Sequence, residues 1–410
     1  MAQTITLSEL GDCKIFTENI DPSAMEQIKS LLSEDAFKGC KVRIMPDVHA
    51  GASCVIGFTA NLRDKVIPNL VGVDIGCGMR VDKFDEENNI DLEIFDKVVR
   101  LVVPAGSDVF KDSDLEIAVG NFLKELHCYP RLRNLPHLKN SCGTLGGGNH
   151  FIELDKDDEG NTYLVIHSGS RNLGKQVCDI YQDVAYHYCF DVDKQQIQNT
   201  IDTLKREGRQ SEIEQELKKL LPSPRVLHKD MAYLEGELRE NYLHDMALCQ
   251  RFAEWNRQTI AENIISVYGI ASGAKLYVEN SFETIHNYID FGSGIIRKGA
   301  ISCSKGERVI IPMNMRDGSL ICIGKGNEDW NYSAPHGAGR IMSRKQAREI
   351  LRVEDFKQSM EGIYTTTVNK NTIDEAPMVY KPMEEIVRNI EPTAAIETII
   401  RPIYNFKAEE

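Results

Sequence analysis

Residues 71–79 place an acid and a thiol three positions apart among glycines, and this short segment constrains the fold more than any other part of the chain. Its three glycines carry no Cβ and tolerate positive φ, so the backbone can turn tightly and direct Asp74 and Cys77 to one point. We interpret the segment as a strand that ends in a turn bearing metal ligands. The alternative is a tight turn around a buried cysteine, because a free cysteine is commonly a small buried hydrophobic residue.

The composition of the whole chain is that of a globular protein. The 410 residues are 42% hydrophobic, which suffices for a large core. No apolar run approaches the roughly 18 residues that a membrane span requires, and the N-terminus lacks the pattern of a secretory signal. The eleven cysteines are scattered without a CxxC pair, which predicts reduced thiols. We therefore predict a cytoplasmic protein without a membrane partner.

The formal net charge of −14 argues against a protein that coats nucleic acid by bulk electrostatics, because such proteins are strongly basic. It does not exclude nucleic acid as a substrate. A local cationic groove together with divalent metals can hold a few phosphates on an acidic protein.

The pattern of the opening segment recurs, since several apolar runs end next to glycines and a polar side chain. These side chains are Asp47 and His49 after residues 41–45, Asn149 and His150 after residues 142–148, and His167 after residues 163–166. No GxxxxGK[ST] pattern occurs, and no GxGxxG sequence has the placing that a dinucleotide fold requires. Neither a P-loop nor a dinucleotide site is therefore predicted.

Hydrophobic periodicity predicts an α+β fold in one large domain, with mixed and antiparallel sheets around the metal centre and helices at their flanks. The predicted helices are residues 22–37, capped by Asp21, then 91–101, 113–127, much of 175–258, and a helix from 343. The predicted strands include residues 41–45, 55–62, 80–84, 163–166, 276–278, 285–288, 295–300, 308–312 and 320–324. Residues 193–222 are highly charged, and we interpret them as a solvated helical insertion, the alternative being an arm that binds a partner.

Five side chains in or beside these segments offer oxygen, sulfur and nitrogen donors. They are Asp74, Cys77, His150, His167 and His286. Such a mixed set suits borderline cations such as Mn²⁺, Zn²⁺, Fe²⁺ or Co²⁺, whereas Mg²⁺ and Ca²⁺ prefer shells of oxygen. Two metals that share Cys77 are conceivable. Spacing alone leaves open whether the donors converge or belong to separate structural turns.

Eight short motifs occur in a fixed order along nearly the whole chain. They are MPDVH at 45–49, VGVDIGCGM at 71–79, GTLGGGNHF at 143–151, HSGSR at 167–171, HN at 286–287, RKGA at 297–300, GKGN at 324–327 and HGAGR at 336–340. In this order they resemble the motifs of the tRNA-splicing ligase family called RtcB. Each motif alone would be weak support, but eight in the right order do not arise by chance.

The resemblance implies an RtcB-type fold over residues 1–410 and an RNA ligase that uses GTP and Mn²⁺. The enzyme would join a 2′,3′-cyclic phosphate or 3′-phosphate end to a 5′-hydroxyl end in tRNA splicing or RNA repair. The implied partner is RNA with broken ends, either tRNA or another structured RNA, together with an archease-like activator.

The resemblance also implies roles for individual residues. Cys77 would bridge two manganese ions, one also held by His167 and His286, the other by Asp74 and His150. His336 would be the nucleophile that takes up GMP, and Asp47 would orient the metal site. The remaining implied nucleotide contacts are Asn149, Glu153, Pro312, Asn314, Gly337, Ala338, Gly339 and Lys407, where Glu153 and Lys407 match guanine-recognising positions and Asn149 a phosphate contact. The implied RNA contacts are Arg171 and Lys298.

The sequence departs from the family pattern near the implied nucleotide site. At residues 312–316 the usual PGSMG is replaced by PMNMR, so Met313 stands for a glycine and Asn314 for a serine. The implied metal ligands and His336 are retained. We therefore expect a divergent paralogue in which nucleotide preference or substrate range has changed. Two alternatives are a metal-dependent phosphoesterase that opens cyclic phosphates without ligating, and an RNA-binding protein without catalytic activity.

Overall fold

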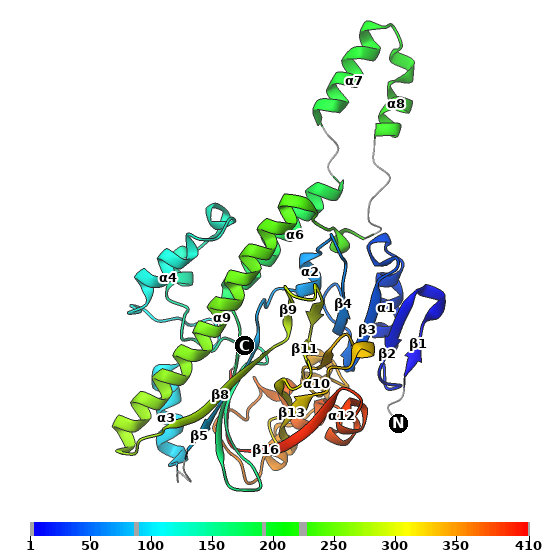
Figure 1. Ribbon diagram of the computed structural model, residues 1–410. Helices are drawn as coiled ribbons and strands as arrows, with labels where there is room; N and C mark the ends of the chain where they lie inside the picture. The colour runs from blue at the N-terminus through cyan, green and yellow to red at the C-terminus, as the bar shows by residue number, and fades with distance from the viewer. Residues whose placement is uncertain (1–3, 86–89, 191–193, 221–227, 409–410) are drawn as a thin grey trace.

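The computed structural model of this chain describes residues 4–85, 90–190, 194–220 and 228–408. It has an α+β architecture in which two large sheets are flanked by helices (Figure 1), as predicted. Among the helices in these ranges, none combines the length and the apolar composition needed to cross a lipid bilayer.

The first sheet has six strands in the order β1-β2-β3-β4-β10-β9. Their bounds are β1 Ile5–Thr6, β2 Asp12–Ile15, β3 Lys41–His49, β4 Ile56–Ala60, β9 Asn287–Ile289 and β10 Ile296–Lys298. Strands β2 and β3 are parallel, so the chain must cross over between them, and helix α1 (Pro22–Leu32) makes this crossover. Asp21 caps the helix by accepting a hydrogen bond from the amide of Ala24, as its position before Pro22 predicts.

The second sheet supplies most of the candidate site. Its order is β12-β13-β16-β6-β7-β5-β8, and the short strand β15 adds to β16. Their bounds are β5 Gly78–Phe84, β6 Phe151–Lys156, β7 Thr162–Ser168, β8 Val278–Ile285, β12 Arg308–Asn314, β13 Gly318–Gly324, β15 Tyr364–Thr365 and β16 Ala394–Lys407. The sheet curls on itself, so that its two end strands β12 and β8 meet. The backbone N–H of Ile310 on β12 donates to the hydroxyl of Thr284 on β8. A small pair, β11 (Ala300–Ser302) and β14 (Ser333–Pro335), lies nearby.

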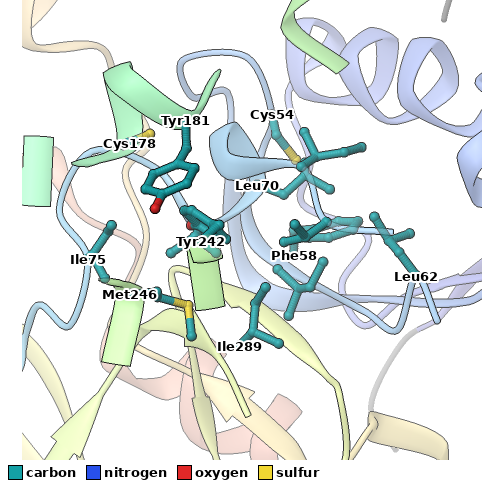
Figure 2. Packing of buried hydrophobic residues seen from close by; sticks show 14 of the residues in the cluster. Cys54, Phe58, Leu62, Leu70, Ile75, Cys178, Tyr181, Tyr242, Met246 and Ile289 are labelled. Atoms are coloured by element: carbon teal, nitrogen blue, oxygen red, sulfur yellow. The ribbon is translucent and has the colours of Figure 1, made fainter. Parts of the chain in front are cut away.

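Apolar side chains fill the space between the sheets and the helices. The long helix α9 (Gly236–Ser272) packs against α6 (Arg171–Phe190), α3 (Leu92–Val102) and β7. Figure 2 shows the core around α2 (Pro68–Val71), where Phe58, Leu70 and Tyr242 pack together. Apart from α7 (Lys194–Arg206) and α8 (Ile213–Leu220), the remaining α-helices of the described residues are α4 Glu116–Leu123, α5 Leu135–Lys139, α10 Arg344–Ile350, α11 Val353–Ser359 and α12 Met383–Ile390.

The charged segment predicted to be helical contains two helices, α7 (Lys194–Arg206) and α8 (Ile213–Leu220). In Figure 1 they form a pair that projects away from both sheets. Residues 193, 221 and 222 of the predicted insertion lie outside the described residues. The grouping of the whole chain into one catalytic domain stays a prediction.

The interpretation of residues 71–79 as a strand ending in a turn was wrong. The short helix α2 precedes the turn, and the strand, β5, follows it. Pro68 at the first helical position favours a helix start, and Gly72, with φ of +91°, ends the helix after four residues. A short apolar run such as this does not distinguish a strand from a helix.

Two other predicted elements have different bounds in the structure. The predicted helix over 113–127 is shorter, since α4 covers only Glu116–Leu123, and the predicted strand 41–45 extends to His49.

Candidate active site

Cys77 lies between two histidines in the buried part of the site. Its Sγ is 3.4 Å from Nε2 of His150 and 3.3 Å from Nε2 of His167. One donor atom from each of the three residues lies within 4.8 Å of the others, and all three side chains are buried. This arrangement is that of a group able to hold a metal ion.

Strand pairing explains why residues so far apart in sequence meet here. His167 on β7 lies opposite Met79 of β5 on one side and Phe151 of β6 on the other. Cys77 immediately precedes β5, and His150 immediately precedes β6, so three neighbouring strands bring the donors together. Gly169 completes the packing, since a Cβ at that position would overlap the carboxylate of Asp74.

The tautomers of both histidines are fixed by backbone carbonyls. The Nδ1–H of His150 donates to the carbonyl of Leu145 at 2.7 Å, and the Nδ1–H of His167 donates to that of Asn149 at 3.2 Å. Each Nε2 is therefore left with a free lone pair that faces Cys77. Such contacts orient histidine ligands in metal sites.

Asp74 and His286 flank this group, so the structure brings all five predicted donors together. Oδ2 of Asp74 is 3.3 Å from Nε2 of His150. The backbone N–H of His286 donates to the carbonyl of Cys77, and the ring of His286 lies 5.2 Å from that of His167 between centroids. Cys77 thus has Asp74 and His150 as one set of neighbours and His167 and His286 as another.

The electrostatic state of the donors fits a cation. Burial, followed by the neighbouring histidines, lowers the pKa of His167 and of His286 well below the usual range, so both rings are neutral. Burial and the charge of Asp74 raise the pKa of the Cys77 thiol well above its usual value. Burial alone would raise the pKa of Asp74, but the contacts with His150 and Cys77 and the nearby histidine charges together outweigh it and lower the pKa to about 2. The set of sulfur, nitrogen and oxygen donors fits a borderline divalent ion.

His336 lies on the far side of His286, and the two ring centroids are 4.8 Å apart. Its Nδ1 donates to Oδ2 of Asp47 at 2.6 Å, and its backbone N–H donates to the same oxygen at 3.1 Å. Nε2 is therefore the nitrogen that is left for reaction. The hydrogen-bond partner of the Asp47 carboxylate is thus His336, and the prediction that Asp47 orients the metal site stays a prediction.

A cavity of about 260 Å³ joins His336 to the candidate metal centre. Asp74, His167, His286 and His336 line it. Every residue predicted to contact the nucleotide also lines it, namely Asn149, Glu153, Pro312, Asn314, Gly337, Ala338, Gly339 and Lys407. The structure therefore places these eight residues where a shared ligand would touch them, although their individual roles stay predictions.

The two predicted RNA-contacting residues lie outside this lining. Arg171, which begins α6 with φ of +56°, donates from Nε to the hydroxyl of Thr144 and from Nη2 to the carbonyl of Gly106. Lys298 is buried, and its Nζ donates to the carbonyls of Ala52 and Asn69 at 2.9 and 2.7 Å. The position of Lys298 does not support an RNA contact, because its ammonium is used within the core.

The altered residues 312–316 form the end of β12 and the start of the turn that follows it. The side chain of Asn314 makes its hydrogen bonds within this turn. Oδ1 of Asn314 accepts the backbone N–H groups of Arg316 and Asp317, and its Nδ2 donates to the carboxylate of Asp317 at 2.8 Å. Met313 is buried on β12, where it belongs to an apolar cluster and lines the cavity. The side chain of Asn314 therefore stabilises the turn, and its amide is already hydrogen-bonded within the loop.

A network of charged residues around Glu375 at the cavity wall escaped the sequence analysis, although Lys407 is a predicted nucleotide contact and Arg340 belongs to the HGAGR motif. The buried carboxylate of Glu375 pairs with Arg340, Arg344 and Lys407 at 3.2, 2.8 and 2.8 Å, and it accepts the hydroxyl of Tyr380. All of these residues line the cavity. No motif marked Glu375, because its charged partners Arg340, Arg344 and Lys407 lie 31 to 35 residues away in sequence.

Helix α9 contributes two further residues that sequence reasoning missed. Nη1 of Arg257 donates to the carbonyls of Gly76 and Ser168, and Nη2 donates to Glu283 at 2.6 Å. Oδ1 of its neighbour Asn256 accepts the backbone N–H groups of two residues. They are Gly143 at 2.8 Å and Thr144 at 3.0 Å. A signal existed, because Asn256 lies four residues from both Phe252 and Ile260, which places a polar side chain on the apolar face of a helix.

Comparison with known proteins shows similarity along almost the whole chain. The family model described as tRNA-splicing ligase RtcB matches residues 33–128 and 93–408. The chain is 31% identical over 398 residues to an RNA-splicing ligase RtcB of Escherichia coli (strain K12), with 89% of this chain and 88% of the relative covered. It is 26% identical over 456 residues to a tRNA-splicing ligase RtcB of Archaeoglobus fulgidus, with 90% and 87% covered.

Proposed function

The chain belongs to the RtcB family of tRNA-splicing ligases, and on this premise we propose that it is an RNA ligase dependent on GTP and two Mn²⁺ ions. The proposed reaction joins a 2′,3′-cyclic phosphate or 3′-phosphate end to a 5′-hydroxyl end through a histidine–GMP intermediate. The observation that carries the proposal is the position of His336, which shares one cavity with the metal donors and has its Nδ1 held by Asp47.

His336 is the proposed nucleophile. A carboxylate on Nδ1 keeps the proton on that nitrogen, so the lone pair of Nε2 is available to attack the α-phosphate of GTP. A P–N bond forms, the bond from the α-phosphate to the bridging oxygen breaks, and pyrophosphate leaves with the electron pair. The charge that develops on the ring is stabilised by the buried carboxylate of Asp47. Gly337, Ala338 and Gly339 line the cavity with small side chains or none, which leaves room for the nucleotide.

The bound cations have a defined place in this proposal. Asp74 and His150 would hold one ion, His167 and His286 the other, and Cys77 both. When bound, they would offset the negative charge of the phosphates and favour departure of the leaving group. The two sets of neighbours around Cys77 support two ions, and the mixed donor chemistry is compatible with manganese.

The guanylate then passes to RNA. An oxygen of the RNA 3′-phosphate attacks the phosphorus of GMP, the P–N bond breaks, and the electron pair returns to Nε2 of His336. The 5′-hydroxyl next attacks the activated 3′-phosphate, GMP leaves, and the hydroxyl proton is released. A cyclic phosphate must first be opened by water, which adds a hydroxyl to phosphorus and frees the 2′-oxygen.

The decisive test is transfer of label from GTP to the protein. The purified protein is incubated with Mn²⁺ and GTP labelled at the α-phosphate, then separated by denaturing electrophoresis. We expect an acid-labile label on the wild type, none on His336→Ala, and an unchanged level on His187→Ala, which alters an exposed histidine of α6. An unlabelled wild type would overturn the nucleotidyl-transfer step.

A second assay separates ligation from its alternatives. A nicked stem-loop with 2′,3′-cyclic phosphate and 5′-hydroxyl ends is incubated with Mn²⁺ and each nucleoside triphosphate in turn. Joining with GTP that disappears in Cys77→Ala supports the ligase. Opening of the cyclic phosphate without joining would support the phosphoesterase, and binding without either reaction would support a non-catalytic RNA-binding protein.

A further inference from the structure

Lys407, near the end of β16, has a second set of contacts that its predicted role in nucleotide recognition does not require. Its ammonium pairs with Glu375 at 2.8 Å and donates to the backbone carbonyl of Asn149, also at 2.8 Å. The side chain is only 4% exposed. Lys407 is therefore held by one acid and one carbonyl.

The carbonyl of Asn149 is shared with a candidate metal ligand. The same oxygen accepts the Nδ1–H of His167, whose Nε2 lies 3.3 Å from Sγ of Cys77. A carbonyl oxygen has two lone pairs and can accept both donors at once. Lys407 and His167 are thus joined through a single atom, and the ammonium helps to fix where that atom lies.

A second contact path links the same two residues. Nζ of Lys407 lies over the ring of Phe151, 5.2 Å from its centroid. The rings of Phe151 and His167 pack edge to face, with their centroids 5.3 Å apart. The strands support both paths, because Lys407 is the register partner of Phe151 and the backbone N–H of Ala408 donates to the carbonyl of His150. The end of β16 therefore pairs with Phe151 and is hydrogen-bonded to the backbone of His150.

We propose that Lys407 is a positioning residue for the metal centre, which holds His167 in its ligating orientation through the carbonyl of Asn149 and the ring of Phe151. The inference rests on the metal centre of the proposed function and on no step that involves GTP or RNA. Partners of this kind contribute to metal affinity without touching the ion, and their loss typically costs about 10- to 100-fold in affinity.

The test measures metal binding to the full chain, without nucleotide. Metal-free protein is titrated with Co²⁺, and visible and near-ultraviolet absorption reports the ligand-field and thiolate charge-transfer bands of the bound ion. The variants are Lys407→Met, which removes the ammonium but keeps the length of the side chain, and Lys407→Arg, which keeps a cationic donor. Lys381→Met is the matched control, because Lys381 is 3% exposed and also donates to two backbone carbonyls, those of Asn19 and Pro46.

We expect Lys407→Met to weaken Co²⁺ binding at least about tenfold and to shift the ligand-field bands. Lys407→Arg should retain most of the wild-type affinity for Co²⁺, and Lys381→Met should bind Co²⁺ as tightly as the wild type does. Circular dichroism and thermal unfolding confirm that each variant is folded. Should Lys407→Met lose its fold, the comparison is made with Lys407→Gln.

Wild-type affinity and spectrum in a folded Lys407→Met or Lys407→Gln would overturn the proposal. Equal weakening in Lys381→Met would also overturn it, since the effect would then reflect the loss of any buried lysine. A wild-type protein that binds no Co²⁺ would overturn the metal centre itself. These results are distinct from a failure of the guanylation assay, which tests His336 and GTP.

Discussion

Asp47 accepts two hydrogen bonds from His336 through a single oxygen, Oδ2, one from the ring Nδ1 at 2.6 Å and one from the backbone N–H at 3.1 Å. The two contacts fix both the rotation of the imidazole and the position of the backbone that carries it. The histidine therefore enters the cavity with its orientation and its tautomer already set.

Replacing Asp47 by Asn tests this relationship. The amide is close in shape to the carboxylate, but it carries no charge and can donate to Nδ1, which would place the ring proton on Nε2. We expect guanylation to fall roughly 10²- to 10⁴-fold, while Co²⁺ affinity stays at the wild-type level because, in the described part of the chain, the carboxylate of Asp47 hydrogen-bonds His336 and none of the candidate metal donors. Rates of label transfer and a parallel Co²⁺ titration check both parts, and a large loss of Co²⁺ affinity would contradict this assignment.

Metal binding should release a proton from Cys77. Burial and the charge of Asp74 raise the pKa of this thiol well above its usual value, so it is protonated at neutral pH before the metal binds. Ligation requires the thiolate, so affinity should rise with pH, up to about tenfold per pH unit for one released proton. Titrations at several pH values and in buffers of different ionisation enthalpy measure the proton count. An affinity that does not change between pH 6 and pH 8 would show that Cys77 does not ligate as a thiolate.

Arg257 should be required for stability as well as for the site. The Arg257→Met variant removes the hydrogen bonds to the carbonyls of Gly76 and Ser168. It also removes the guanidinium that pairs with the carboxylate of Glu283 at 2.6 Å. Breaking a buried ion pair costs about 3–5 kcal/mol in the free energy of unfolding, and the value here should lie at the lower end because Glu283 is partly exposed. Urea unfolding measures the loss. The double variant Arg257→Met with Glu283→Gln should recover part of it, and no recovery would contradict the assigned pairing.

Two buried carboxyls on β6 predict a pH dependence of stability. Burial raises the pKa of Glu153 to about 7 and that of Asp155 well above its usual range. The folded state then binds more protons than the unfolded state, so their contribution is full below about pH 4. For Glu153 it is lost as the pH rises through about 7, and for Asp155 as the pH rises through its raised pKa. Asp155→Asn should therefore be less sensitive to pH than the wild type between pH 5 and 8. The free energy of unfolding, measured against pH, checks this with Asp158→Asn as an exposed control.

Four of the five candidate metal donors could be predicted from sequence because they follow a local rule, an apolar run beside glycines and a polar side chain, whereas His286 has no adjacent glycine. Their convergence could not, since it depends on the pairing of β5, β6 and β7, which places Met79 and Phe151 on either side of His167. The α+β class followed from periodicity, whereas the four-residue helix α2 did not, because Pro68 and Gly72 set its ends within a short apolar run.

Partners that depend on tertiary contacts were beyond the sequence. Asp47 belongs to the MPDVH motif, but the side chain that donates a hydrogen bond to it is a histidine 289 residues further along the chain. The burial of Lys298 and the anchoring role of Arg257 likewise depend on which backbone carbonyls pack against them. A motif marks the presence of such a side chain, and only the packed structure assigns its contact.

The place of β16 in the sheet order has a consequence for how the protein is made. This C-terminal strand lies between β13 and β6, in the interior of the eight-stranded sheet, and it carries Lys407. A ribosome that has synthesised every residue up to 390 has therefore produced both flanks of the sheet but not the strand that joins them. We expect the emerging chain to acquire its complete cavity only when β16 has left the exit tunnel, so that premature termination before Lys407 yields a polypeptide whose cavity lacks one wall.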